Sequence, residues 1–82
     1  MIQKQLNEIL RKHKLWLDDE EGGERADLWS SDMRGSDMRY CNLMDCNLME
    51  SDMRGANLRN ANLRGSDMRG SDMRYCNLMD CN

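Results

Sequence analysis

The sequence contains no proline, phenylalanine, valine or threonine, and its only isoleucines are Ile2 and Ile9. Because β-branched and aromatic residues favour strands, their scarcity means that propensity alone predicts few strands. The chain also lacks a signal peptide and any apolar run long enough to cross a bilayer. We therefore expect a cytoplasmic location and no membrane partner, and in that setting the four cysteines are expected to be free thiols.

The balance of charged and apolar residues favours disorder when it is considered alone. Hydrophobic residues make up 39% and charged residues 33% of the 82 residues, a composition that buries little apolar surface. The net charge of −3 is too small to indicate a nucleic-acid or membrane partner. However, a strict repeat occupies most of the chain, and periodicity outweighs composition as evidence of fold. A chain of this length forms one small domain.

Residues 1–25 precede the repeat and have a pattern of their own. Four apolar residues have the spacing of one helical face: Ile2, Leu6, Ile9 and Leu10. This spacing predicts a helix over residues 2–13, followed by an extended apolar segment over residues 14–17. The acidic run that ends in two glycines at residues 22–23 predicts a loop. We interpret residues 1–25 as the cap of a repeat domain, and a helix-in-groove partner site is the alternative.

Residues 26–82 consist of eleven five-residue repeats and a two-residue remainder, with nothing inserted between them. The central residue of each repeat, position i, is always Leu or Met. Position i−2 is Ala, Ser or Cys, position i−1 is Asp or Asn, and position i+1 is mostly Arg. The central residues form the expected core ladder: Leu28, Met33, Met38, Leu43, Leu48, Met53, Leu58, Leu63, Met68, Met73 and Leu78.

A period of five excludes both regular helix and straight strand as the structure of the repeats. In a helix, five residues would turn the apolar position by about 140° each time, so no buried face would form. In a strand, an odd period would send the apolar residue to alternate faces. The pattern becomes consistent when each repeat is a short extended piece followed by a corner. Positions i−2 and i then point inward, and glycine or another turn residue at i+2 forms the corner.

The motif of these repeats resembles the A(D/N)LXX motif of pentapeptide-repeat proteins over residues 26–82. The resemblance implies a right-handed quadrilateral β-helix with four repeats per coil, that is, an all-β solenoid of about three coils behind a short α-helical cap. Residues 1–25 are also similar to the leaders of short bacterial members. The chain departs from the family preference by its frequent Ser or Cys at i−2 and Met at i, which bears on stability rather than on topology.

Four repeats per coil would stack residues twenty apart in one row, such as Met33, Met53 and Met73. On the outside of such a row, an aspartate at i−1 and an arginine at i+1 lie on the same side of the extended piece. We expect these side chains to neutralise each other. Exposed ion pairs contribute only about 0–1 kcal/mol each, so they are interpreted as tolerated surface rather than as the source of stability.

The residues that could carry chemistry do not form a recognisable catalytic or metal site. Cys41, Cys46, Cys76 and Cys81 all occupy position i−2, at spacings that match no zinc motif. They are interpreted as small buried residues in place of alanine, with a disulfide or a metal site as the alternative. His13 has no nucleophile or acid at a motif distance and is interpreted as a helix-end residue. We therefore expect no enzymatic activity, no cofactor and no bound metal.

The charge pattern predicts no direct binding of nucleic acid, because seven arginines share the repeats with nine acidic residues. The main hypothesis is a non-enzymatic, rigid structural or protein-interaction module whose partner the sequence does not identify. The alternative is implied by the resemblance, since some pentapeptide-repeat proteins bind type II topoisomerases such as DNA gyrase by mimicking DNA. The weak net charge of the repeats gives that alternative little support.

Several outward positions carry apolar side chains and mark candidate interfaces. Trp29 and Met49 are expected to stack on one side of the coils, and Met44 on the next. The last coil, with Leu78 and Cys81, is expected to leave its end open. Pairing of two copies through this end would cover unpaired backbone edges.

Overall fold

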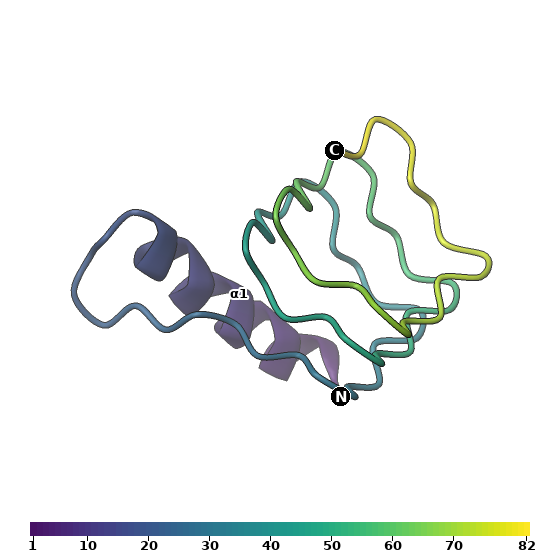
Figure 1. Cartoon of the computed structure of the whole chain (residues 1–82), viewed down its shortest axis with the longest axis horizontal. Coiled ribbons are helices and arrows are strands. Elements are labelled where there is room, and N and C mark those ends of the chain that lie inside the picture. The colour runs from purple at the N-terminus through teal and green to yellow at the C-terminus, as the bar shows by residue number, and fades with distance from the viewer.

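The computed structural model describes residues 1–82, which form one helix and a stack of coils (Figure 1). Helix α1 (Gln3–Leu17) lies beside the first coil, and the last coil lies at the other end of the molecule. The molecule measures 36 × 24 × 23 Å. Helix α1 is neither long nor apolar enough to cross a membrane.

The coils are joined by isolated parallel β-bridges rather than by continuous strands. Each bridge pairs two residues that are twenty positions apart, such as Asp27 with Asn47 and Asn47 with Asp67. Backbone hydrogen bonds follow the same offset, and the N–H of Leu28 donates to the C=O of Asn47 over 2.8 Å. One coil therefore contains four repeats, as the resemblance to pentapeptide-repeat proteins implies. The expectation of an all-β fold holds only as parallel pairing between coils.

Each repeat ends in a corner whose backbone is left-handed. The corner residue at i+2 has a positive φ in all eleven repeats, whether or not it is glycine. Seven corners use another residue: Ser30, Tyr40, Asp45, Glu50, Asn60, Tyr75 and Asp80. The left-handed conformation costs a residue with a side chain about 1–2 kcal/mol. The closure of the coil therefore imposes this conformation, whatever the residue type at the corner.

The core is the row of Leu and Met side chains inside the coils. The seven central residues from Leu28 to Leu58 are no more than 1% exposed. The next three, Leu63, Met68 and Met73, are half-buried and pack against that core. Leu78 in the last coil is 46% exposed. Burial is thus complete where coils lie on both sides of a residue, or where α1 covers one side, and it declines toward the last coil.

The polar residues at i−2 are satisfied inside the coil. The Ser51 hydroxyl donates to the C=O of Leu48 over 2.8 Å, and the Cys41 thiol donates to the C=O of Met38 over 2.7 Å. Each of these acceptors is the central residue of the preceding repeat. No buried side-chain nitrogen or oxygen lacks a partner. Serine at i−2 therefore adds a hydrogen bond across the corner that alanine does not make, so the polar interior is compatible with a packed core.

Two sequence predictions about residues 1–25 are wrong. The helix does not end at His13 but continues to Leu17, so the segment over residues 14–17 is helical rather than extended. His13 is not a helix-end residue either, because it lies within α1 and is fully buried. The physical reason is that Leu6, His13 and Leu17 continue one helical face, with the polar His13 at an inward position.

Arginine and aspartate pair on the outside of the coils as the sequence predicts. Arg34 Nε and Nη2 donate to both carboxylate oxygens of Asp32 over 2.9 and 2.8 Å. The Arg34 Nε also lies 3.8 Å from Asp52 in the next coil, which continues the row of charges. The hydrogen bond from Arg39 lowers the pKa of Asp37 to about 2, and the bond from Arg74 lowers the pKa of Asp72 to about 2.

Stability is therefore expected to fall as the pH drops from about 4 toward 2. Because the pKa of these aspartates is lower in the folded protein than in the unfolded chain, the unfolded chain takes up protons first and gains stability relative to the fold. The variant with Asp32→Asn, Asp52→Asn and Asp72→Asn should show a shallower dependence of Tm on pH over this range. Circular dichroism melting at several pH values measures it.

Other repeats of this chain already have asparagine at position i−1, where the variant introduces it. Asn57 and Asn62 occupy the same i−1 position and accept the N–H of residue i+1 over 3.2 and 3.1 Å, as the aspartates do. Asparagine therefore keeps the backbone contact and removes the titrating carboxylate together with its ion pair to the arginine. If the variant and the parent protein lose Tm equally between pH 4 and 2, the Asp–Arg pairs do not cause the acid sensitivity.

Candidate interaction site

Helix α1 is held on the first coil by side chains of the helix that form hydrogen bonds with the backbone edge of that coil. The Gln3 amide nitrogen donates to the C=O of Asp37, and the N–H of Asp37 donates to the Gln3 Oε1, both over 2.8 Å. One side-chain amide thus makes two backbone hydrogen bonds with Asp37, as a backbone strand would. At this position, Gln3 takes the place of a neighbouring coil.

His13 makes the second connection between α1 and the coils. The N–H of Ala26 donates to His13 Nδ1 over 2.9 Å, so the proton of the neutral ring lies on Nε2, which donates to the C=O of Met44 over 2.7 Å. The ring also stacks on Trp16, with 5.5 Å between centroids. Arg25 lies over the other aromatic ring of this cluster, 5.9 Å from the Trp16 centroid. His13 therefore joins the start of the first coil to its end.

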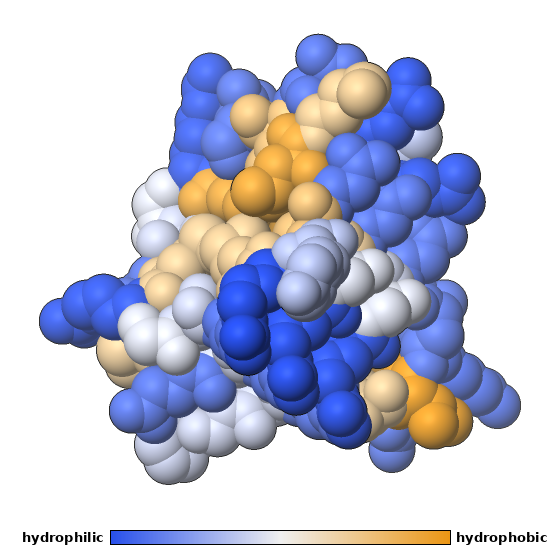
Figure 2. Space-filling view, turned by 90° about the vertical axis from the view of Figure 1, so that its right-hand side faces the viewer, coloured by the Kyte–Doolittle hydropathy of each residue, from blue (hydrophilic) through white to orange (hydrophobic).

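The opposite end of the stack is an apolar surface without a covering helix. We call it the terminal face, and it consists of Leu63, Met68, Met73, Cys76, Leu78 and Cys81. Figure 2 looks at the side of the molecule where the last coil lies and shows an apolar patch among hydrophilic residues. The sequence places Leu78 and Cys81 at this end, and the structure brings them together with the ladder residues of the last coil.

The backbone of the terminal face also carries unpaired groups. In the first coil, the N–H groups of positions i and i+2 donate to the next coil along the chain. In the last coil, the N–H groups of Met68, Gly70, Met73 and Leu78 make no backbone hydrogen bond. The C=O groups of Ser66, Ser71 and Cys76 accept none. This end therefore offers both donors and acceptors to another backbone edge.

The outward apolar residues predicted from the sequence separate into two environments. Trp29 and Met49 line one hollow of about 410 Å³ together with Glu50, Arg69 and Gly70. The Trp29 side is exposed, with 56% of that residue accessible. Met44 does not join this hollow; it is half-buried, and its C=O accepts the hydrogen bond of His13.

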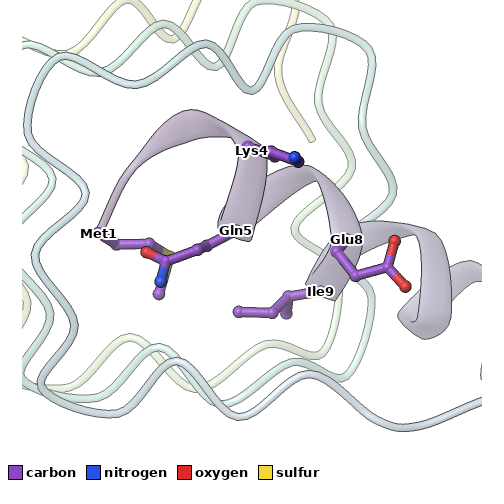
Figure 3. A pocket seen from close by; sticks show the side chains of 5 residues that line it. All are labelled: Met1, Lys4, Gln5, Glu8 and Ile9. Atoms are coloured by element: carbon purple, nitrogen blue, oxygen red, sulfur yellow. The ribbon is translucent and has the colours of Figure 1, made fainter.

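A second hollow, of about 550 Å³, lies on α1 and is lined by residues of the helix and its start. Figure 3 shows the five side chains that line it, with Lys4 and Glu8 next to the row formed by Met1, Gln5 and Ile9. The Gln5 side chain accepts the N–H of Ile2 over 3.1 Å and so belongs to the start of the helix. The hollow is lined by these five residues alone, and none of the predicted interface residues reaches it.

The cysteines are free and shielded to different degrees. Burial raises the pKa of the Cys46 thiol to about 12 and that of the Cys41 thiol to about 11. Burial also raises the pKa of Cys76 and Cys81, which lie nearer the terminal face. Because the thiolate is the nucleophile and the metal ligand, these raised pKa values disfavour the reactive form of the thiols at neutral pH. No group of three or more His, Cys, Asp or Glu residues is arranged to hold a metal ion.

Several residues of these surfaces have no counterpart among the sequence-based candidates. Gln3 and His13 fix the cap, and Glu50, Arg69 and Gly70 complete the hollow beside Trp29. The twenty-residue offset places Arg69 in the same row as Trp29 and Met49, because these three residues lie at the same position of successive coils. No sequence signal identifies the partners of Gln3 and His13, because each bond joins residues from distant segments.

Comparison with known proteins agrees with the five-residue repeat of the sequence. The chain matches the family model for pentapeptide repeats in eight copies, over residues 24–48 and 46–82. Among solved structures, it is similar to alr5209, a pentapeptide repeat protein from Nostoc PCC 7120, with 18% identity and a TM-score of 0.38 over 87% of this chain and 71% of that chain. No curated protein matches it. Since the family model covers well over half of its residues, the chain belongs to the pentapeptide repeat family.

Proposed function

We propose that this protein is a non-enzymatic, rigid protein-interaction module of the cytoplasm, built as a right-handed quadrilateral β-helix, and that two copies pair through their terminal faces. Pentapeptide repeat proteins are generally structural or interaction modules, which supports the first part of the proposal. The observation that carries the second part is the terminal face, where exposed Leu78 adjoins backbone donors and acceptors that have no partner in the chain.

A second copy fits this face because the face is self-complementary. It presents unpaired N–H groups, such as those of Met68 and Met73, beside unpaired C=O groups, such as those of Ser66 and Ser71. A two-fold axis would bring the donors of each copy to the acceptors of the other. The opposite end of the stack is occupied by α1, so the pairing would close as a dimer and would not continue as a filament.

The expected affinity is modest, because the face is small. The two shorter dimensions of the molecule are 24 and 23 Å. An end of that size offers less area than a standard interface of about 800 Å² per partner. We therefore expect a dimer in the micromolar range, one that also leaves the sides of the coils free for other proteins.

Sedimentation equilibrium of the 82-residue protein tests the pairing. We expect a concentration-dependent dimer that Leu78→Glu abolishes, because the substitution places a charge in an apolar contact. Tyr40→Glu is the matched control, since Tyr40 is 71% exposed and lies in the first coil; this variant should dimerise like the parent protein. A parent protein that stays monomeric to about 500 μM, far above the micromolar dissociation constant expected for this face, contradicts the pairing.

The alternative function, a DNA-mimicking modulator of DNA gyrase, has weaker support. Five of the nine carboxylates in the repeats are paired with an arginine of the same repeat. Pairing of this kind removes the continuous negative surface that mimicry of duplex DNA requires. A gyrase supercoiling assay should accordingly show neither inhibition nor protection by the protein.

A further inference from the structure

The first repeat breaks the charge compensation that the other repeats with aspartate at position i−1 maintain. Five repeats pair an aspartate at i−1 with the arginine at i+1: Asp32–Arg34, Asp37–Arg39, Asp52–Arg54, Asp67–Arg69 and Asp72–Arg74. In the first repeat, Trp29 stands where the arginine would be. Asp27 accepts the N–H of Trp29 over 3.2 Å and the amide of Asn47 over 3.4 Å, but it forms no ion pair.

A second unneutralised carboxylate lies in the hollow beside Trp29. Glu50 lines this hollow and makes no ion pair or side-chain hydrogen bond. Arg69 lines it as well, with its guanidinium held by Asp67 over 2.6 and 2.9 Å and its Nη2 at 3.5 Å from the Met49 sulfur. Gly70 contributes no side chain above Glu50, whose Cγ would lie only 3.2 Å from a Cβ at that position. The hollow thus combines an apolar floor with a free negative charge.

The Trp29 indole is open to a cation from outside the chain. Trp16 already has the guanidinium of Arg25 over its ring, whereas no cation of the chain lies over Trp29, which is 56% exposed. Indole is the aromatic side chain that attracts cations most strongly. An indole flanked by Asp27 and Glu50 therefore favours a positively charged group, and it disfavours a polyanion such as nucleic acid.

We propose that the Trp29 face, made of Asp27, Trp29, Met49, Glu50 and Gly70, docks a basic segment of a partner protein. A Lys or Arg side chain of that segment lies over the Trp29 indole with its charge near Asp27 and Glu50, and an apolar neighbour enters the hollow against Met49. This inference rests on the proposed role as an interaction module and names the chemistry of one partner. It is separable from the terminal face, whose apolar side chains are those of other residues, because only the Gly70 backbone belongs to both surfaces.

The matched variants follow from the other repeats. Trp29→Arg gives the first repeat the Asp–Arg pair that five repeats already have, so the fold is expected to accept it. Glu50→Gln removes the other free charge at a corner that other residue types also occupy. Tyr75→Arg makes the same change from an exposed aromatic to arginine at a residue that is 89% exposed and belongs to a different side of the coil, and it serves as the control for net charge.

Fluorescence anisotropy with the 82-residue protein provides the test. The probes are a fluorescein-labelled ten-residue peptide of alternating Lys and Leu, and its counterpart with Glu in place of Lys. We expect binding of the Lys peptide only, weaker at about 300 mM than at about 50 mM salt. Trp29→Arg should weaken this binding by roughly tenfold and Glu50→Gln by roughly threefold, with Tyr75→Arg unchanged.

Each contrary result has a defined meaning. Equal binding of the two peptides, no binding of the Lys peptide, or equal losses in Trp29→Arg and Tyr75→Arg overturns the docking of a basic segment at this face. Loss of the dimer in Trp29→Arg also overturns it, because the occupant would then be a second copy. Peptide binding that persists in Leu78→Glu, together with a monomeric parent protein, would overturn the terminal pairing alone.

Discussion

Replacing His13 by alanine is expected to lower the free energy of unfolding by about 3–5 kcal/mol. The substitution leaves the N–H of Ala26 and the C=O of Met44 without partners in a buried place, and each unsatisfied group costs about 1–3 kcal/mol. It also removes a fully buried ring that stacks on Trp16. Small domains are stable by only about 5–15 kcal/mol, so the loss threatens the whole fold. Urea unfolding followed by circular dichroism measures the change.

Two further variants separate the contributions of the two bonds. His13→Asn keeps an acceptor near the position of Nδ1 for the N–H of Ala26, and His13→Gln keeps a donor near the position of Nε2 for the C=O of Met44. Each should recover part of the stability that alanine loses. Lys14→Ala is the control on the same helix, because that side chain is 68% exposed; its effect should stay below about 0.5 kcal/mol. A cost of less than about 1 kcal/mol for His13→Ala would mean that α1 is not held by His13.

His13 also explains why the prediction from the sequence ended α1 too early. A helical face is recognised from apolar residues, and His13 interrupts the apolar row that leads from Leu6 to Leu17. Its inward position becomes evident only when Ala26 and Met44, from the first coil, are known to supply its hydrogen-bond partners. Local periodicity carries no information about partners that lie 13 and 31 residues further along the chain.

The coils were more predictable from the sequence because every repeat has the same residue pattern. A period of five with an apolar centre predicts a corner in each repeat, and the four repeats per coil implied by the resemblance to pentapeptide-repeat proteins then place Asp27, Asn47 and Asp67 in one row. The conformation of the corners was only partly foreseen. Glycine and asparagine are typical of a left-handed backbone and so indicate it in the sequence. Tyr40 and Tyr75 are not, and they adopt it at φ 62° and 65° because their coil must close.

The candidate surfaces were predictable to the extent that they follow the rows. Trp29 and Met49 share a row, so their meeting follows from the twenty-residue offset. Met44 has the same outward position in its repeat, but it lies on the next side of the coil, where its C=O is bound by His13 of α1. The position of a cap relative to four sides of a coil depends on tertiary contacts, which the repeat pattern does not contain.

Replacing Leu48 by alanine should be the most costly truncation within the coils, at about 2–5 kcal/mol. Leu48 is completely buried in the middle coil, in the same row as Leu28 below and Met68 above. The cavity cannot collapse easily, because bridges from Asn47 to Asp27 and to Asp67 fix the spacing of the three coils. Urea unfolding of the variant and the parent protein at low micromolar concentration measures the difference.

Two matched variants decide whether burial in the ladder causes this cost. Leu48→Met should cost less than about 1.5 kcal/mol, since methionine already serves at five ladder positions. Leu78→Ala makes the same truncation at a residue that is 46% exposed and should cost less than about 1 kcal/mol in the monomer. Equal costs for Leu48→Ala and Leu78→Ala in the monomer would mean that the ladder does not carry the stability. A cost for Leu78→Ala that rises with protein concentration would instead show that a second copy covers the terminal face.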